Sequence, residues 1–373
     1  MTTAIIFIAV LALLIFVHEL GHYVTAVRNG VGAHEFGFGF PPRIIGVVKN
    51  DDGTWELVGR RQKREYNNTI FSLNWIPLGG FVRIKGEDGT DTDPDSFATQ
   101  SAWVRFKILV AGVLMNIVTA YVLFVIALWM GVPEPVPDGT PGSAVYVSQV
   151  QENSPAAAMG VRVGDRVRAL CDDSGCTQID GAATLQSVAA AHAGRHVTLE
   201  VARGNETLTL NGTLREGDAA QDRGALGIGM VNAKNAALSF LEIIGGAAYQ
   251  TWDFLVMIVS GLGALLWNLL TGAGLSGDVA GPVGIAVMTG QMAALGLAQL
   301  AHFAAILSLN LAVINILPIP ALDGGRILFV LIEKLRGGKP VNRNVEAIVH
   351  GVSFIALIVL MAVVTVRDVL HFF

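Results

Sequence analysis

Four long apolar stretches constrain the fold of this chain more than any other feature. They cover residues 4–27, 108–132, 292–317 and 347–366, and each reaches the ~20 mostly apolar residues that a helix needs to cross a bilayer. Only 15% of the 373 residues are charged, against ~25% in typical soluble domains. The sequence therefore predicts a polytopic α-helical membrane protein with four transmembrane helices.

The distribution of Lys and Arg predicts how these helices are oriented. Eleven basic residues lie between the first and second spans, and five more follow the third. Cytoplasmic loops carry such an excess of positive charge. We therefore expect both loops to be cytoplasmic and both termini to lie outside.

A fifth apolar stretch, 236–272, has the hydrophobicity of a span but contains several polar residues, and 236–290 has no Lys or Arg. If it crossed the membrane, the two basic loops would fall on opposite sides, against the positive-inside rule. We predict an interfacial helix and loop over 236–290, on the outer side.

The first apolar stretch ends in the sequence HELGH, residues 18–22. A charged side chain within a bilayer costs at least ~2.5–3.5 kcal/mol, so His18, Glu19 and His22 need a functional reason to lie there. A cleaved signal peptide does not account for them, because no basic residue precedes the apolar run and no A-x-A-like site follows it.

H-E-x-x-H on a helix is typical of zinc sites. Residues four apart lie on nearly the same face of a helix, so His18 and His22 can bind one metal ion, with Glu19 close enough to move protons there. A histidine pair without metal would not explain the adjacent glutamate, and burying all three uncompensated is costly. Catalytic zinc usually has three protein ligands, so one more must come from elsewhere.

The sequence NILPIPALDGGR, residues 315–326, contains the best candidate for this ligand. It ends the third span on the cytoplasmic side, the side where HELGH ends the first span. Pro318 and Pro320 break the helix just before Asp323, and two glycines after it permit close backbone approach. A helix-ending turn with a capping aspartate is the alternative, and H-E-x-x-H at matching depth favours Asp323 as the third zinc ligand.

Two regions between the spans read as separate domains. Residues 30–103 are rich in β-branched and aromatic residues, and the sequence NDDG at 50–53 predicts a hairpin turn. We expect a membrane-associated β region on the cytoplasmic side. A Pro-rich linker at 133–141 then leads to a soluble domain at 142–232, outside the membrane.

The sequence SPAAAMGVRVGDRV, residues 154–167, predicts a short helix capped by Ser154 and ended by Gly160. A second helix over 183–193 and two strands over 195–213 follow. This pattern resembles a bacterial PDZ domain, whose binding edge would correspond to the LGIG sequence. The alternative is a spacer with no binding role. Cys171 and Cys176 flank a turn sequence in this outer domain, so a hairpin disulfide is expected.

A substrate helix must be opened before it can be cut, because its peptide groups are hydrogen-bonded to one another. An exposed strand edge can pair with the opened segment. The β sequences at 34–48 and 70–85 lie beside the HELGH end of the first span. We predict that Gly79, Gly80 and Phe81 contact the substrate there.

Taken together, the motifs resemble those of the site-2 protease family of intramembrane zinc metalloproteases, in its bacterial regulator-of-sigma-E-protease-like form. The resemblance extends over nearly the whole chain and rests on HELGH (18–22), GFGF (37–40), PLGGFVRIKGE (77–87), AGVLMN (111–116), the PDZ signature, GPVGIA (281–286) and NILPIPALDGG (315–325). The single PDZ signature departs from relatives with two in tandem, which leaves open any substrate gating that depends on a pair.

This resemblance implies a zinc metalloendopeptidase with Zn²⁺ bound by His18, His22 and Asp323. Glu19 would be the general base on the attacking water and then protonate the leaving amine, and Asn315 would hydrogen-bond the substrate backbone. We expect the other polar groups of the spans, Asn116, His302 and His350, to be structural, as helix-packing and hydrogen-bonded side chains. The predicted domains of the chain are 1–29 (first span), 30–103 (β region), 104–132 (second span), 142–232 (PDZ), 236–290 (interfacial), 291–325 (third span) and 345–367 (fourth span).

The expected partners are single-span membrane proteins, such as anti-sigma-factor-like regulators or remnant signal peptides, together with the lipid bilayer. The PDZ domain would allow peptide or protein contact. The net charge of −5 gives no nucleic-acid signature. We expect the chain in a bacterial inner (cytoplasmic) membrane, with the active site near the cytoplasmic side.

Two other classes of function fit the sequence less well. A non-catalytic PDZ adaptor with structural zinc would not need Glu19. A metal transporter would show internal repeats and several midplane ligands, and the sequence has neither.

Overall fold

The computed structural model describes residues 2–60, 66–87, 91, 93–131, 134–151, 153–204, 206–216, 224–234, 238–271, 280–339 and 341–372. The chain forms two compact units. The first comprises residues 1–125, 244–290 and 301–373, and the second comprises residues 126–243 and 291–300.

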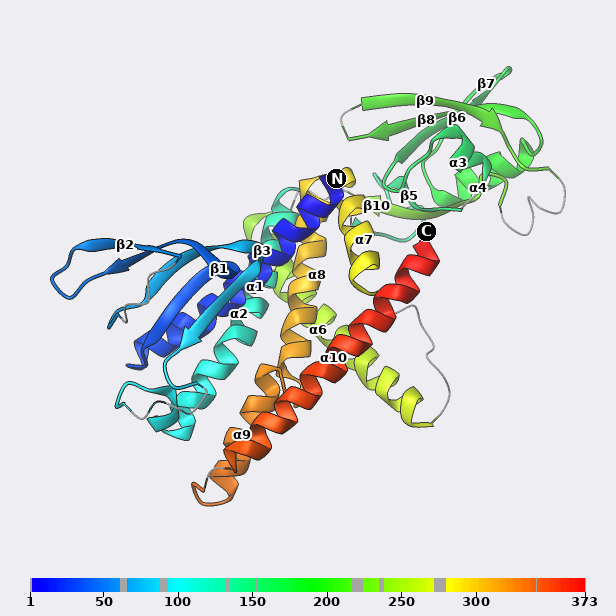
Figure 1. Cartoon of the computed structure of the whole chain (residues 1–373). Coiled ribbons are helices and arrows are strands. Elements are labelled where there is room, and N and C mark those ends of the chain that lie inside the picture. Colours follow the sequence, from blue (N-terminus) through cyan, green and yellow to red (C-terminus); the bar gives the residue numbers. More distant parts are fainter. Residues whose placement is uncertain are drawn as a thin grey trace. The chain divides into compact units, whose positions relative to one another are not determined.

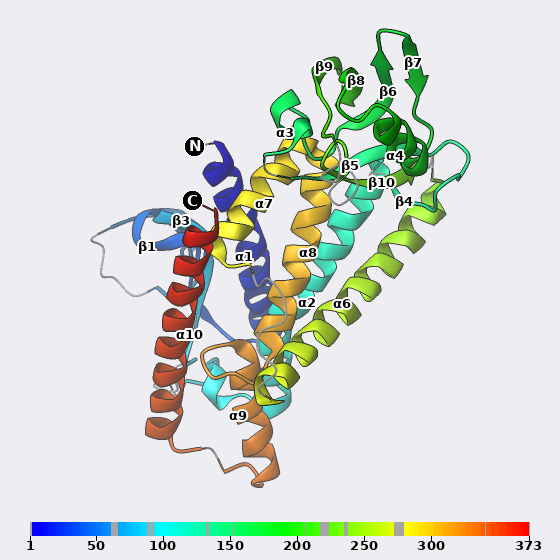
Figure 2. The ribbon, with the colours of Figure 1, turned by 90° about the vertical axis from the view of Figure 1, so that its right-hand side faces the viewer.

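Seven helices carry most of the apolar sequence. They are α1 (Thr2–Arg28), α2 (Ala102–Trp129), α6 (Phe240–Thr271), α7 (Pro282–Leu295), α8 (Leu297–Ile316), α9 (Asp323–Leu335) and α10 (Arg343–Phe372). Figures 1 and 2 show α8 beside α1 and α2, and the Ser308 hydroxyl of α8 donates to the Asn116 carbonyl of α2 at 2.8 Å.

Among the described residues, five helices are long and apolar enough to cross a membrane. Four of them, within α1, α2, α8 and α10, coincide with the four predicted spans. The chain is therefore an integral membrane protein, and the number of helices that cross stays a prediction.

The fifth candidate is Phe240–Leu265 of α6. Its Phe254 stacks on Phe124 of α2 with ring centroids 5.6 Å apart, and both rings contact His302 of α8. Residues 236–237 and 272–279 of the predicted interfacial segment lie outside the described residues. Length and composition thus permit this helix to cross a membrane, and its interfacial placement stays a prediction.

A small sheet lies beside α1 in Figure 1, with the strand order β2 (Trp55–Gly59), β1 (Ala33–Lys49), β3 (Ile70–Ile84). The predicted hairpin turn at NDDG joins β1 to β2, with Gly53 at φ 86° and Asn50 donating its N–H to Thr54.

The first half of β1 has β3 on both sides. Residues 35–38 pair with 80–83 of β3 on one side and with 70–73 on the other. Residues 70–73 also pair with 45–47 of β1, whereas 80–83 pair only with β1 among the described strands. The end of β3 is therefore an edge of the sheet.

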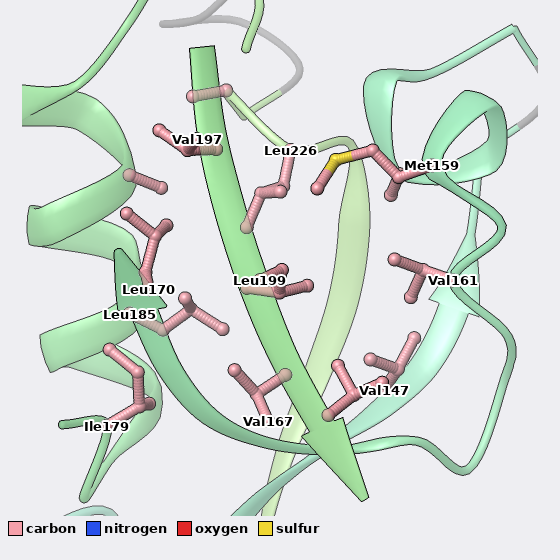
Figure 3. Packing of buried hydrophobic residues seen from close by; sticks show 14 of the residues in the cluster. Val147, Met159, Val161, Val167, Leu170, Ile179, Leu185, Val197, Leu199 and Leu226 are labelled. Atoms are coloured by element: carbon pink, nitrogen blue, oxygen red, sulfur yellow. The ribbon is translucent and has the colours of Figure 1, made fainter. Parts of the chain in front are cut away.

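The second unit has a sheet of seven strands in the order β4-β10-β5-β6-β8-β9, with β7 paired to β6. The strands are β4 (Glu134–Pro135), β5 (Ala144–Val150), β6 (Arg166–Asp172), β7 (Gly175–Gln178), β8 (His196–Arg203), β9 (Glu206–Thr213) and β10 (Ile228–Lys234). Two helices, α3 (Pro155–Met159) and α4 (Ala182–Ala191), accompany them. Figure 3 shows Leu199 of β8 at the centre of its core, with Val167 and Leu226 turned toward it.

Three local predictions for this unit are confirmed. Ser154 caps α3 by accepting the Ala157 N–H at 3.1 Å, and Gly160 ends the helix at φ 80°. Cys171 and Cys176, directly opposite on β6 and β7, form a disulfide.

Candidate metal centre

Three predicted ligands converge at one point in the first unit. Nε2 of His18 lies 3.0 Å from Oδ2 of Asp323, and Nε2 of His22 lies 3.3 Å from the same oxygen. The two Nε2 atoms are 3.1 Å apart. Both histidines are buried in α1, and Asp323 is the first residue of α9. Residues more than 300 positions apart in the chain thus present three donor atoms to one small volume.

These separations suit a tetrahedral zinc ion. Zinc bonds of about 2.0–2.1 Å place neighbouring ligands about 3.3–3.4 Å apart at the corners of a tetrahedron. The three donor atoms lie 3.0–3.3 Å apart, so only small shifts separate them from that arrangement. Imidazole nitrogen and carboxylate oxygen are donor types that zinc accepts, and three ligands leave the fourth corner open.

Hydrogen bonds on the far side of each imidazole orient it for metal binding. His22 donates its Nδ1–H to the carbonyl of Ile108 at 2.8 Å, which leaves the lone pair on Nε2. The amide of Asn116 contacts Nδ1 of His18 at 3.2 Å, and its Oδ1 is buried with no partner among the described residues.

The two observations on Asn116 are explained together if its amide is turned by 180°. The oxygen then accepts the Nδ1–H of His18, and Nε2 again carries the lone pair. Asn116 therefore orients His18, one of the predicted ligands, beyond the helix packing predicted for it.

Two glycines bring α1 and α2 into close contact at the site. A Cβ on Gly112 would lie 2.3 Å from Nε2 of His22 and 2.7 Å from Cε1 of His18. A Cβ on Gly21 would lie 2.5 Å from the carbonyl oxygen of Ala111. Gly112 lies in the AGVLMN motif, one of those on which the family resemblance rests. Only the three-dimensional structure shows that the imidazoles of His18 and His22 occupy the space where a side chain of residue 112 would lie.

A tight turn before α9 aims Asp323 at the histidines. Ala321 has φ 84°, a conformation that is costly for a residue with a side chain. Its N–H donates to Nδ1 of His350 at 2.8 Å, which fixes the turn from α10 and confirms His350 as a hydrogen-bonded structural histidine. A Cβ on Gly324 or Gly325 would lie within 2.5 Å of a carbonyl oxygen of the preceding turn, so the turn requires both glycines.

Glu19 lies at the meeting point of two cavities. One, of about 210 Å³, is lined by Glu19, Asn315 and Asp323 together with His18 and Asn116. The other, of about 240 Å³ and called here the catalytic cavity, extends from Glu19, His22 and Asp323 toward β3.

The carboxylate of Glu19 accepts the N–H of Val82 in β3 at 3.2 Å. The side chain that the sequence predicts to move protons is thus held next to the ligands by the edge strand. Asn315 lines the same cavity as Glu19.

The three predicted substrate-contact residues of β3 have different surroundings. Gly79, at φ +86°, packs against Ile15, so close that a Cβ there would lie 2.6 Å from it. A Cβ on Gly80 would lie 2.9 Å from the Gly37 carbonyl oxygen and 3.2 Å from Phe16, and Gly80 and Phe81 also line the catalytic cavity. The glycines therefore let β3 approach α1 within one turn of His18.

The prediction that His302 is a hydrogen-bonded structural histidine is wrong. Its Nδ1 is buried without a partner among the described residues. The ring lies instead between Phe124 and Phe254, with centroids at 5.1 and 5.7 Å.

Two histidines one helical turn apart, a carboxylate from a distant part of the sequence and a glutamate in the adjoining cavities are typical of zinc metallopeptidases. The profile of Peptidase family M50 matches residues 6–360. The chain belongs to this family, the site-2 proteases, and is a zinc metalloprotease with Zn²⁺ as its cofactor.

Full-length relatives carry corresponding names. The chain is 29% identical to the zinc metalloprotease RasP of Bacillus licheniformis, over 100% of both chains. It is 28% identical to the regulator of sigma-W protease RasP of Bacillus subtilis, over 100% of this chain and 99% of that one. A putative zinc metalloprotease of Clostridium perfringens is 33% identical over 96% of this chain and 95% of its own length.

Proposed function

We propose that this protein is an intramembrane protease that hydrolyses peptide bonds within the transmembrane segments of single-span proteins. One observation carries the proposal. The cluster of His18, His22 and Asp323 has two of its members in the second half of α1, a helix long and apolar enough to cross a membrane. A site at that depth has lipid-embedded chains as its substrates.

In this mechanism His18, His22 and Asp323 hold the zinc ion. The bound ion would supply Lewis acidity, which makes water a stronger nucleophile and polarises a carbonyl. Glu19 takes a proton from the attacking water and delivers it to the leaving amine. The Val82 N–H holds the Glu19 carboxylate in position for both transfers, and Asn315 donates a hydrogen bond to the substrate backbone across the cavity.

The edge of β3 is suited to bind the substrate in extended form. The Val82 N–H points away from β1 to Glu19, and alternate residues of a strand present their backbone groups to the same edge. Gly80 and Ile84 therefore face the catalytic cavity together with Val82, and all three line it. An opened substrate segment adds to this edge as a further strand.

The sheet beside α1 contacts the bilayer in this proposal. Trp55, Leu57 and Trp75 on its strands are 62–66% exposed, and aromatic side chains favour membrane interfaces. We infer that the sheet lies at the cytoplasmic surface of a bacterial inner membrane, that four helices cross it, and that the second unit is a PDZ domain on the outer side. We infer that its substrates are anti-sigma-factor-like regulators or remnant signal peptides. The name of one relative, the regulator of sigma-W protease, supports the first of these.

A cleavage assay on a matched series of substrates tests the proposal. The purified protein in detergent is incubated with single-span substrates whose transmembrane segment is either poly-Leu or carries Gly, Pro, Asn or Ser near its middle. Mass spectrometry should locate cleavage within the segment, with faster initial rates for the helix-breaking versions. No cleavage of any substrate would favour the adaptor function, and equal rates on poly-Leu would contradict strand addition.

A variant of the enzyme tests the strand edge itself. Proline in place of Ile84 removes one of the N–H groups that face this edge. It should slow cleavage while zinc content stays at the wild-type level. Wild-type cleavage by this variant would contradict the role of the edge.

A further inference from the structure

A second and larger cavity lies next to the catalytic cavity in the first unit. It measures about 810 Å³ and lies between α2, α9, α10 and the segment after β3. Phe97, Leu109, Phe329 and Phe354 form apolar walls. Its volume lies in the range of sites that bind ligands, and the mechanism above gives it no role.

Four residues belong to the walls of both cavities: Glu87, Leu109, Ala321 and Arg326. Glu87 follows β3, and Arg326 lies one turn into α9, three residues after the zinc ligand Asp323. The Arg326 guanidinium forms an ion pair with the Glu87 carboxylate. This pair therefore stands where the two cavities adjoin.

The charges of the catalytic cavity are unbalanced. Its described lining includes the carboxylates of Glu19, Glu87 and Asp323, and Arg326 is the one Lys or Arg among the described residues that line it. Peptide hydrolysis creates a further carboxylate here on one product and an amino group on the other. Water supplies an oxygen to the carbonyl carbon, the C–N bond breaks, and the products are an amine and a carboxylic acid that ionises at neutral pH.

We propose that Arg326 binds the new carboxylate of the cleaved substrate, releasing Glu87, and that the 810 Å³ cavity then receives the product segment. This inference rests on the proposed proteolytic function. A guanidinium binds a carboxylate through two parallel hydrogen bonds, so Arg326 remains paired when the product carboxylate replaces that of Glu87. The cavity beyond supplies apolar walls for the side chains of a segment that came from a membrane helix.

Arg105 is a matched control. It lines the larger cavity but not the catalytic one, and it forms a two-pronged ion pair with Glu333 at 2.5 and 3.0 Å. Removing its charge therefore changes the larger cavity without touching the shared wall.

The test compares two probes that differ only at the carboxyl end. The fluorescein-labelled peptide Ala-Leu-Leu-Ala-Gly-Ala is made as the free acid and as the amide, and binding to zinc-loaded full-length protein in detergent is followed by anisotropy. Wild type should bind the acid at least tenfold more tightly. Arg326→Gln should reduce this acid-to-amide ratio about tenfold, Glu87→Gln should increase it, and Arg105→Gln should leave it within twofold.

An unchanged ratio in Arg326→Gln would overturn the proposal, as would an equal loss in Arg105→Gln. If Arg326→Gln loses zinc or helical structure, Arg326→Lys is used in its place, because lysine keeps the positive charge but lacks the planar guanidinium. Arg326→Lys should lower the acid-to-amide ratio by a smaller factor than the tenfold expected for Arg326→Gln. Cleavage of a single-span substrate is measured on the same preparations. Cleavage with an Arg326-independent ratio refutes this inference alone, whereas an Arg326-dependent ratio without any cleavage refutes the protease function.

Discussion

Replacing Gly112 by alanine tests how closely α2 must approach the zinc ligands. The new Cβ would lie 2.3 Å from Nε2 of His22, over 1 Å closer than the 3.4–4 Å of an ordinary contact. His22 is also held to α2 by its hydrogen bond to Ile108 at 2.8 Å, so the ring must shift by about 1 Å or lose that bond. Zinc sites tolerate deviations of only about 0.2 Å.

We therefore expect Gly112→Ala to bind zinc at least about 100-fold more weakly, at the upper end of the losses seen when a ligand's support is removed. Zinc affinity is measured by competition with a chromogenic chelator, alongside cleavage of a single-span substrate. Gly261→Ala is the control, because a Cβ there meets no described heavy atom within 4 Å, and it should match wild type. Wild-type zinc affinity in Gly112→Ala would refute the packing argument.

Three further predictions concern the surroundings of the site and the second unit. Asn116→Ala should weaken zinc binding about 10–100-fold by freeing the His18 ring, and an unchanged affinity in the chelator competition would contradict this. Burial raises the pKa of Glu35, but hydrogen bonds led by those from Arg43 at 2.6 and 2.9 Å lower this pKa below its ordinary value. Its stabilising effect is thus present above the ordinary pKa and lost as the pH falls through the lowered one. The Tm gap between wild type and Glu35→Gln should shrink from about pH 6 to about pH 3, and a constant gap would argue against it. Mass spectrometry without reductant should find Cys171 and Cys176 linked, and two free thiols would disprove the bridge.

The convergence of His18, His22 and Asp323 could be predicted from the sequence because two separate local patterns specify it. His18 and His22 are one helical turn apart, so helix geometry alone places them on one face. Asp323 follows a break in an apolar helix at matching membrane depth. Both patterns survive in the structure because local backbone geometry determines them, and neither depends on the packing of neighbouring side chains.

What the sequence could not give is the set of contacts between elements. Asn116 looked like a helix-packing residue because nothing in its own helix shows that His18 lies opposite. His302 lacks the expected hydrogen bond because two phenyl rings, one from the distant α6, surround it. The contact of Arg326 with Glu87 likewise joins segments more than 200 residues apart, and only the folded chain brings them to one wall.

The fifth long apolar helix shows a different difficulty. Length and composition permit α6 to cross a membrane, whereas the absence of Lys and Arg from 236–290 favours an interfacial position. Charge distribution and hydrophobicity are independent signals, and here they disagree.

In the proposed mechanism, zinc binding and catalysis depend on different residues, and one paired measurement tests this separation directly. Zinc content and cleavage of a helix-breaking single-span substrate are measured on the same detergent preparations of wild type, Glu19→Gln and Asp323→Ala. Glu19→Gln should keep stoichiometric zinc and lose cleavage, because it removes the proton acceptor and leaves the ligands in place. Asp323→Ala should lose both. Full cleavage by Glu19→Gln, or wild-type zinc content in Asp323→Ala, would contradict the roles assigned to these two carboxylates.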